Sequence, residues 1–413
     1  MQNGRFGLLG KTLKHSYSKG IHQKLGSYSY ELIEIPPESL KDFVINGEFD
    51  GFNVTIPYKK DIIAFLDEVH SATSEIGAVN TVVKRDGKLF GYNTDFDGMC
   101  YTVNRAGIDI KDKVVAILGT GGTSNTAKAV CKSLGAKQIL IVSRSGDLNY
   151  DNVYEKQEID VVVNTTPVGM YPQTESSPID LARLKNISGV IDVVYNPFVT
   201  KLIEQAKSLG IKCADGLPML VAQAKYASEK FTGSFIPDSV IEEIVRDLRK
   251  EKLNVVLIGM PGSGKSTLGK LIASQLNKEF IDIDQAIVER VKMSIPEFFE
   301  KFGEAEFRKV EKQLCVEIGK ESGKVIATGG GVVKDRANRF SLRQNGRIYY
   351  LSRALEKLSL EGRPLSKDRK TVEKLYQERK SAYEFFADVI IDNNGQIQSA
   401  LKGVLEDYEN FSY

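Results

Sequence analysis

Residues suited to binding phosphate form the clearest pattern in this sequence. Residues 259–267 read GMPGSGKST, which matches G-x-x-x-x-G-K-[ST] in full and lies between an apolar run and a helical pattern. In this pattern backbone amides surround the phosphates, Lys265 reaches the β- and γ-phosphates, and the Ser266 hydroxyl ligates Mg²⁺. The sequence therefore predicts a nucleoside triphosphate site, whose expected contacts are Gly259, Gly262, Ser263, Gly264, Lys265, Ser266 and Thr267.

A second glycine turn, GTGG at residues 119–122, follows the apolar run VVAIL. Glycines permit a tight turn here and let the backbone approach a pyrophosphate at a helix N-terminus. The third glycine of the dinucleotide pattern falls on Ser124, so this turn alone could also be a plain strand-to-helix turn. About 20 residues further on, where NAD enzymes place an acid, stand Ser143 and Arg144. An arginine suits the 2′-phosphate of NADP, although a solvated surface arginine is the alternative.

Polar residues that could bind a hydroxylated acid lie in the first hundred positions. Lys59 ends the stretch NVTIPYK, and Asp95 belongs to NTDFDG. A lysine–carboxylate pair can move a proton, whereas a surface ion pair would contribute little stability. The stretch HSYS offers Ser16 and Ser18 on one side if the segment is extended.

Charged residues in the second half suit a substrate with a carboxylate and hydroxyls. FIDIDQAI places Asp282 and Asp284 on one face of an expected strand, and residues 327–333 form another glycine turn. Arg308 and Arg379 lie on expected helices, and two arginines suit a carboxylate. Taken singly, each arginine could equally be a charge on a helix surface.

The elements that must position these residues alternate between strand and helix. Short apolar runs bounded by glycine or proline are typical of buried parallel strands. We therefore expect an α/β fold with a first α/β lobe over residues 1–100, a Rossmann-type lobe over 101–250 and a P-loop domain over 251–413. The expected strands include 28–35, 49–57, 160–167, 189–197 and 211–216, and the expected helices include 202–210 and 238–252.

The length of the chain predicts the number of its domains, and its charge narrows the classes of possible partner. The 413 residues predict two to three domains at about 150 residues each. Lys and Arg number 56 against 54 Asp and Glu, which argues against a nucleic-acid or membrane-surface partner held by bulk charge. No apolar run approaches a membrane span, and the four cysteines form no CxxC pair. We expect a cytoplasmic protein with reduced thiols, and the oligomeric state stays open.

Residues 1 to about 246 resemble shikimate dehydrogenase. HSYS, NVTIPYK, IGAVNT, NTDFDG, GTGGT, NTTPVGM, DVVYNP and GLPMLVAQA occur in the order of that family. The resemblance implies a substrate lobe and an NADP lobe that reduce 3-dehydroshikimate with NADPH, with Lys59 as acid/base and Asp95 as its partner. It implies substrate contacts from Ser16, Ser18, Asn53, Thr55, Asn80, Tyr195 and Gln223, and cofactor contacts from Gly119, Gly121, Gly122, Thr123, Ser143, Arg144, Gly216 and Met219.

Residues from about 253 to 395 resemble shikimate kinase, a nucleoside-monophosphate-kinase-like P-loop fold. The P-loop, D-x-D, F-R-x-x-E, G-G-G, R-P-L and R-x-x-x-Y occur in order. The lid departs from the family, because Leu360 stands near where an adenine-stacking arginine is expected. The resemblance implies that Arg308 and Arg379 clamp the shikimate carboxylate and that Gly330 and Gly331 line the ring. It implies that Asp284 holds the ring hydroxyls and is placed to accept a proton. It also implies that Asp282 supports Mg²⁺ and that Arg363 stabilises the transferring phosphate.

The two resemblances predict one bifunctional enzyme of aromatic precursor biosynthesis, because the product of the first reaction is the substrate of the second. NADPH would reduce 3-dehydroshikimate to shikimate, and MgATP would then phosphorylate the 3-hydroxyl. Two alternatives stay open. The first half could oxidise quinate with NAD, and the second half, given its short lid, could sense nucleotide with little catalysis.

Overall fold

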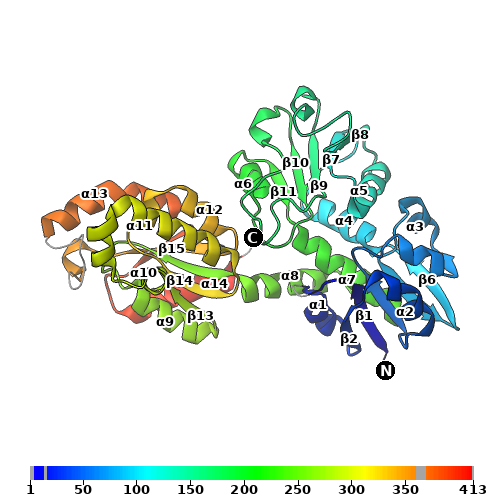
Figure 1. Cartoon of the computed structure of the whole chain (residues 1–413), viewed down its shortest axis with the longest axis horizontal. Helices are drawn as coiled ribbons and strands as arrows, with labels where there is room; N and C mark the ends of the chain where they lie inside the picture. Colours follow the sequence, from blue (N-terminus) through cyan, green and yellow to red (C-terminus); the bar gives the residue numbers. More distant parts are fainter. Residues whose placement is uncertain (1–3, 14–15, 360–368, 412–413) are drawn as a thin grey trace. The chain divides into compact units, whose positions relative to one another are not determined.

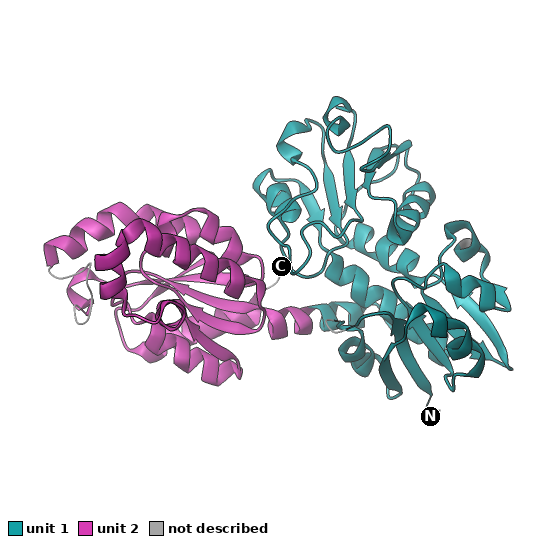
Figure 2. Cartoon of the chain, in the orientation of Figure 1, with its two compact units in different colours: residues 1–245 teal, residues 246–413 magenta. Residues whose placement is uncertain are grey.

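The computed structural model describes the chain except for residues 1–3, 14–15, 360–368 and 412–413. It divides into two compact units, Met1–Val245 and Arg246–Tyr413 (Figure 2). The boundary lies inside helix α8 (Ser239–Lys252), whereas the sequence indicated a boundary after residue 250. In the described part of the chain, no helix is long and apolar enough to cross a membrane.

The first unit begins with a mixed six-stranded sheet in the order β2-β1-β3-β5-β6-β4 (Figure 1). Strand β3 stops at Val54 rather than continuing to residue 57, because a turn follows in which the Tyr58 amide donates to the Thr55 carbonyl. The elements are β1 (Arg5–Gly10), α1 (Ser18–Leu25), β2 (Ser29–Glu34), α2 (Leu40–Asn46), β3 (Gly51–Val54), β4 (Glu68–Val69), α3 (Ser71–Ile76), β5 (Thr81–Arg85) and β6 (Lys88–Tyr92).

The second sheet of this unit is parallel throughout, in the order β11-β10-β9-β7-β8. Strand β7 has β8 on one side and β9 on the other, so the chain reverses its winding direction there, and ligands bind at such a switch point. The elements are α4 (Thr94–Arg105), β7 (Val114–Leu118), α5 (Gly122–Ser133), β8 (Gln138–Val142), β9 (Val161–Asn164), β10 (Gly189–Asp192), α6 (Lys201–Ser208), β11 (Lys212–Ala214) and α7 (Gly216–Thr232).

The second unit has its own parallel sheet, in the order β13-β14-β12-β15-β16. The P-loop joins β12 to α9 and therefore lies at the carboxyl edge of this sheet. The elements are β12 (Asn254–Ile258), α9 (Lys265–Leu276), β13 (Glu279–Asp282), α10 (Ile283–Val291), α11 (Ile295–Lys320), β14 (Lys324–Ala327), α12 (Ala337–Arg343), β15 (Gly346–Ser352), α13 (Arg369–Phe386), β16 (Val389–Asp392) and α14 (Ile397–Asn410).

Helices cover both faces of this sheet, which explains why its central strand β12 is buried along its whole length. Along β12, Val255 and Leu257 pack with residues of α9 and α14, whereas Val256 and Ile258 pack with residues of α10, α11 and α13 (Figure 1). Successive side chains of a strand point to opposite faces, so both sets are buried. The P-loop therefore begins at the end of a strand whose side chains are buried on both faces of the sheet.

One sequence-based expectation about this unit is wrong. Asp282 and Asp284 do not share a strand face, because β13 ends at Asp282 and Asp284 lies in the first turn of α10. The Asp282 carboxylate accepts hydrogen bonds from the Asp284 and Gln285 amides, so it caps the helix. The cap ends the strand two residues before Asp284, so the two carboxylates do not alternate along it.

A buried carboxyl at the end of β10 connects this strand to the end of β9 and to the N-cap residue of α6. Asp192 ends β10 and is fully buried. It accepts hydrogen bonds from Asn164 Nδ2 at 2.9 Å, the Val194 amide at 3.1 Å and Thr200 Oγ1 at 2.6 Å. Burial raises the pKa of Asp192 from 3.8 to about 7, although these hydrogen bonds oppose the rise.

We expect Asp192 to make the stability of the first unit fall as pH rises from about 4 to about 7. Over this interval the unfolded carboxyl has ionised while the folded one keeps its proton, so the folded state binds more protons and the free energy of unfolding decreases, by on the order of 4 kcal/mol in full. Urea unfolding followed by circular dichroism should show the slope in the wild type and lose it in Asp192→Asn. The exposed Asp147→Asn is the control, and equal slopes in all three proteins would contradict the assignment.

Candidate active sites

A lysine and an aspartate from separate elements meet in the first unit. Lys59 lies in the turn after β3 and Asp95 in the first turn of α4, yet Lys59 Nζ lies 2.5 Å from Asp95 Oδ2. The two side chains are only 20% and 11% exposed, so water screens their charges less than at the surface. The backbone supports this placement, because the Lys59 carbonyl accepts a hydrogen bond from the Val79 amide. The pair predicted from sequence is therefore assembled and partly enclosed.

Asn80 connects this pair to its surroundings. Its Nδ2 lies 2.9 Å from Asp95 Oδ1 and 3.4 Å from Gln223 Oε1, and its Oδ1 accepts from the Thr94 amide at 2.7 Å. Both oxygens of the Asp95 carboxylate are thus occupied, one by Lys59 and one by Asn80. The structure brings together Lys59, Asn80, Asp95 and Gln223 from the predicted set.

The structure holds the other predicted substrate contacts through separate interactions. Asn53 is 4% exposed and hydrogen-bonds Tyr30 and Thr81, so both ends of its amide are engaged within the protein. Thr55 follows β3 directly, and its amide donates to the Leu9 carbonyl. Tyr195 packs its ring against that of Tyr17, with centroids 5.3 Å apart, which places the HSYS stretch beside it.

Residues 16–18 are turned, not extended. Tyr17 has helical backbone angles and Ser18 begins α1, so the extended segment on which Ser16 and Ser18 would share one side is not formed. The Ser16 hydroxyl instead accepts a hydrogen bond from the Ser18 amide at 3.2 Å. A serine side chain that satisfies a nearby backbone amide favours such a turn over a strand.

The glycine turn of the second sheet lies at its switch point. Gly119 has a φ of 106° and its amide donates to the Val142 carbonyl, which brings Ser143 and the exposed Arg144 next to the turn. Ser124, where a third glycine was expected, donates its hydroxyl to the Gly119 carbonyl at 2.8 Å. A β-carbon added at Gly121 or Gly122 would meet no described atom within 4 Å. The N-terminus of α5 is therefore open to an anion such as a dinucleotide phosphate.

Two further predicted cofactor contacts lie at the start of α7. A β-carbon on Gly216 would lie 2.1 Å from the Val193 carbonyl oxygen, so only glycine permits this close approach of helix and strand. Met219 is 8% exposed, and its carbonyl faces Gly98 of α4. Thr123 lies in the first turn of α5. Their contacts with a cofactor stay predictions.

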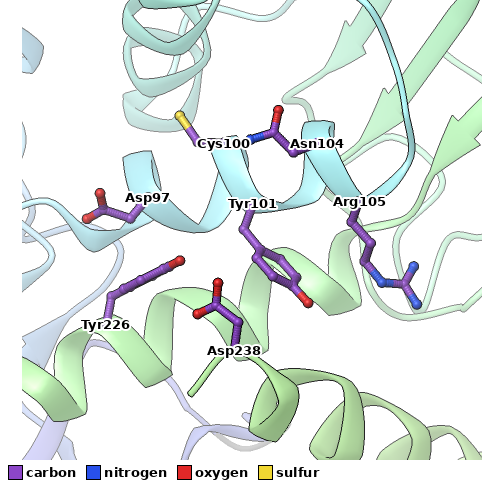
Figure 3. Close-up of a pocket in the computed structure, with 7 residues that line it drawn as sticks. All are labelled: Asp97, Cys100, Tyr101, Asn104, Arg105, Tyr226 and Asp238. Carbon is purple, nitrogen blue, oxygen red and sulfur yellow. The ribbon is translucent and has the colours of Figure 1, made fainter. Parts of the chain in front are cut away.

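A cavity of about 460 Å³ lies elsewhere in this unit, between α4 and α7 (Figure 3). Its described lining residues include none of those predicted for either reaction. Arg105 binds Glu242 of α8 through two nitrogens, at 2.7 and 2.9 Å, and Tyr101 hydrogen-bonds the same carboxylate. These bonds fasten the first turn of α8 to α4. The lining residues are Asp97, Cys100, Tyr101, Asn104, Arg105, Tyr226 and Asp238.

The P-loop of the second unit has the groups that a nucleotide requires. Gly259, Gly262 and Gly264 all have positive φ, which a loop wrapped around a phosphate needs. Lys265 is 8% exposed, and its Nζ bonds the carbonyls of Gly259 and Met260 at 2.9 and 3.0 Å. Among the described residues, the buried Ser263 hydroxyl has no hydrogen-bond partner. The cradle therefore fits a phosphate chain.

Ser266 and Asp282 lie together as a magnesium site would require. Ser266 Oγ donates to Asp282 Oδ2 at 2.6 Å, and both are hard oxygen groups of the kind Mg²⁺ prefers. No cluster of three or more His, Cys, Asp or Glu that could hold a metal exists in the part of the chain that the structure describes. Mg²⁺ at this position would thus share its coordination with phosphate oxygens and water.

Arg308 is held in place by two glutamates of its own helix. Its Nη1 lies 2.7 Å from Glu311 Oε2, and its Nε and Nη2 lie 3.2 and 3.0 Å from Glu304 Oε1. Burial works against its charge, but these carboxylates raise the pKa of Arg308 overall. Burial also raises the pKa of Glu311, and the nearby Asp284 adds to that rise while Arg308 opposes it. A substrate carboxylate at Arg308 would compete with Glu304, the more exposed of the two glutamates.

The glycine turn after β14 links the arginines to the P-loop. Arg379 Nη1 and the Tyr383 hydroxyl both donate to the Gly330 carbonyl, at 3.0 and 2.5 Å. A β-carbon on Gly330 would lie 2.5 Å from the Pro261 ring, and one on Gly331 would lie 2.2 Å from Arg308 Nη2. The predicted Arg308, Gly330, Gly331 and Arg379 therefore converge beside the P-loop. The predicted Arg363 lies outside the described residues.

Sequence reasoning missed several supporting residues. Thr81 and Thr94 hydrogen-bond the amides of Asn53 and Asn80, and Glu304 and Glu311 hold Arg308. The signals were present in the motifs GAVNT, NTDFDG and FRKVE, which contain Thr81, Thr94 and Glu311. Glu304, four residues before Arg308, is recognisable only as a helical i, i+4 partner.

Comparisons with known proteins agree with this arrangement. Residues 8–82 match the family model of the shikimate dehydrogenase substrate binding domain, and residues 261–409 match that of shikimate kinase. The shikimate dehydrogenase (NADP(+)) of Clostridium perfringens strain SM101 is 35% identical over 269 residues, which cover 59% of this chain and 98% of the relative.

The solved structures that resemble this chain include shikimate dehydrogenases as well. A chorismate mutase/shikimate 5-dehydrogenase fusion protein from Clostridium acetobutylicum is 32% identical with a TM-score of 0.58, covering 60% of this chain and 98% of that one. Shikimate 5-dehydrogenase from Thermus thermophilus, in complex with NADP(H) and shikimate, is 30% identical with a TM-score of 0.53, covering 59% and 98%. The chain therefore belongs to the shikimate dehydrogenase family and carries a shikimate kinase domain behind it, so that one polypeptide joins an NADP-dependent oxidoreductase to an ATP-using phosphotransferase of the shikimate pathway.

Proposed function

We propose that the first unit reduces 3-dehydroshikimate to shikimate at Lys59 and Asp95, and that the second phosphorylates the shikimate 3-hydroxyl at the P-loop. The observation that carries this proposal is the convergence of the predicted groups from separate elements in each unit. Lys59, Asn80, Asp95 and Gln223 meet in the first, and Arg308, Gly330 and Arg379 meet beside the P-loop in the second.

In the first unit, Lys59 supplies the proton of the reduction. NADPH, when bound, supplies a hydride to the carbonyl carbon. The Lys59 ammonium donates its proton to the carbonyl oxygen, which becomes the new hydroxyl. Asp95 keeps the ammonium oriented, and Asn80 keeps Asp95 from rotating by occupying its other oxygen. Arg144, exposed directly after β8, supports a preference for the 2′-phosphate of NADP.

In the second unit, the substrate hydroxyl must be held in line with the γ-phosphorus of ATP. We assign Arg308 and Arg379 to the carboxylate and Asp284 to the hydroxyls, where Asp284 accepts the proton as the new O–P bond forms and the bond to ADP breaks. Lys265 binds the phosphates and lowers the cost of the developing charge. The unpartnered Nε of Arg379, buried among the described residues, supports its assignment to an anion.

Lys59→Ala tests the first assignment. Without the proton donor, we expect kcat for 3-dehydroshikimate reduction to fall by about 10²- to 10⁴-fold, while shikimate phosphorylation by the same protein stays unchanged. Both rates are measured spectrophotometrically on one preparation. Lys60→Ala, on the exposed neighbouring lysine, is the matched control. Parallel loss of both activities would indicate misfolding, and full reduction activity would rule out Lys59 as the donor.

Arg379→Lys tests the second assignment. Lysine keeps the charge but loses the forked geometry that binds a carboxylate with two hydrogen bonds. We expect KM for shikimate to rise about 10- to 100-fold in kinase assays, with KM for ATP and the dehydrogenase rate unchanged. Arg369→Lys, an exposed arginine on the same helix, is the control. An unchanged KM for shikimate would remove Arg379 from the site.

The same assays address the two alternatives. Wild-type turnover of quinate with NAD in preference to shikimate with NADP would replace the first assignment. Absence of shikimate-dependent ADP release from the wild type would replace the second with a nucleotide-sensing role.

A further inference from the structure

Arg353 lies at the switch point of the second unit's sheet. It is the first residue after β15, the strand that neighbours β12 and its P-loop. The chain winds from β12 to β13 and β14 on one side and to β15 and β16 on the other, so the crevice between the ends of β12 and β15 is where a ligand binds such a sheet. A β-carbon added to Gly264 of the P-loop would lie 3.5 Å from Arg353 Nη1.

The Arg353 guanidinium has no hydrogen-bond or ion-pair partner among the residues that the structure describes. Its Nε is buried and unsatisfied. Two arginines close to it in sequence do have partners. Arg343 binds Asp388 at 2.8 Å, and Arg347 binds Asp407 through two nitrogens. A buried donor without a partner costs free energy, so a structural arginine normally finds one. Arg353 instead keeps its donors available beside the P-loop.

Hydrogen bonds hold the backbone on both sides of Arg353. The Ser352 carbonyl accepts from the Asn393 amide at 2.8 Å, and the Ala354 amide donates to Asn394 Oδ1 at 2.7 Å. Asn393, which is 3% exposed, also donates its Nδ2 to the Ser263 carbonyl of the P-loop at 2.6 Å. Asn393 therefore bonds both the backbone beside Arg353 and the P-loop, which fixes the Arg353 backbone relative to the phosphate cradle.

We propose that Arg353 is a nucleotide-binding residue of the kinase unit, whose guanidinium binds the phosphate chain of the nucleotide held by the P-loop. A permanently charged group with free N–H donors fits a polyphosphate, because such hydrogen bonds are charge-assisted. The inference rests on the proposed kinase function. It adds a cation from the end of β15 to the predicted Lys265 and Arg363.

Binding of MgADP to the full chain, measured by isothermal titration calorimetry without shikimate, tests Arg353 directly. We expect Arg353→Ala to raise Kd for MgADP about 10- to 100-fold, with KM for shikimate and the dehydrogenase rate unchanged. Arg336→Ala, on an exposed arginine of the same unit, should leave Kd as in the wild type. Arg353→Gln, which keeps most of the side-chain length, gives the same test if the alanine variant does not fold.

Inorganic tripolyphosphate separates phosphate binding from base stacking. If Arg353 binds phosphates, the alanine variant should weaken inhibition of the kinase by tripolyphosphate as much as it weakens MgADP binding. Unchanged inhibition together with weaker MgADP binding would overturn the phosphate assignment, and unchanged MgADP affinity would overturn the inference altogether. A wild type that binds MgADP without phosphorylating shikimate would contradict only the proposed function.

Discussion

Parallel pairing of strands gathers the phosphate-binding turns of the two parallel sheets at one edge of each sheet, and the nucleotide sites depend on this constraint. Strands that run in the same direction end at the same edge, so residues distant in sequence become neighbours there. Gly119 and Ser143 meet after β7 and β8 in this way, and the P-loop, the Gly330 turn and Arg353 meet after β12, β14 and β15.

Partial burial strengthens the charged pairs of both units. Lys59 and Asp95 are shielded enough for their charges to interact strongly, yet both side chains keep some exposure to solvent. The Arg308 side chain is 18% exposed and pairs with Glu311, which is only 1% exposed, and a buried charge without its partner is strongly destabilising. Each unit therefore contains a carboxylate that holds a cation in place.

Much of the architecture could be predicted from local sequence. Apolar runs before glycine turns identified β7 and β12, and the P-loop and the helices carrying Arg308 and Arg379 were expected from pattern alone. Two departures from the expected elements arose where a side chain hydrogen-bonded a nearby backbone amide. Asp282 caps α10 and ends β13, and Ser16 accepts from the Ser18 amide where the chain turns into α1. Such local bonds compete with extended structure, and periodicity does not detect them.

Sequence by itself determined the residue types, their order and the family resemblance, because those properties are carried by motifs of a few adjacent positions. Tertiary structure alone decided which of these residues touch. It placed Lys59 against Asp95, engaged both ends of the Asn53 amide, brought Arg379 to the Gly330 carbonyl and left Arg353 unpaired among the described residues beside the P-loop. The reason is physical: pairing and desolvation depend on distances between separate elements, and those distances exist only once the sheets and helices have packed.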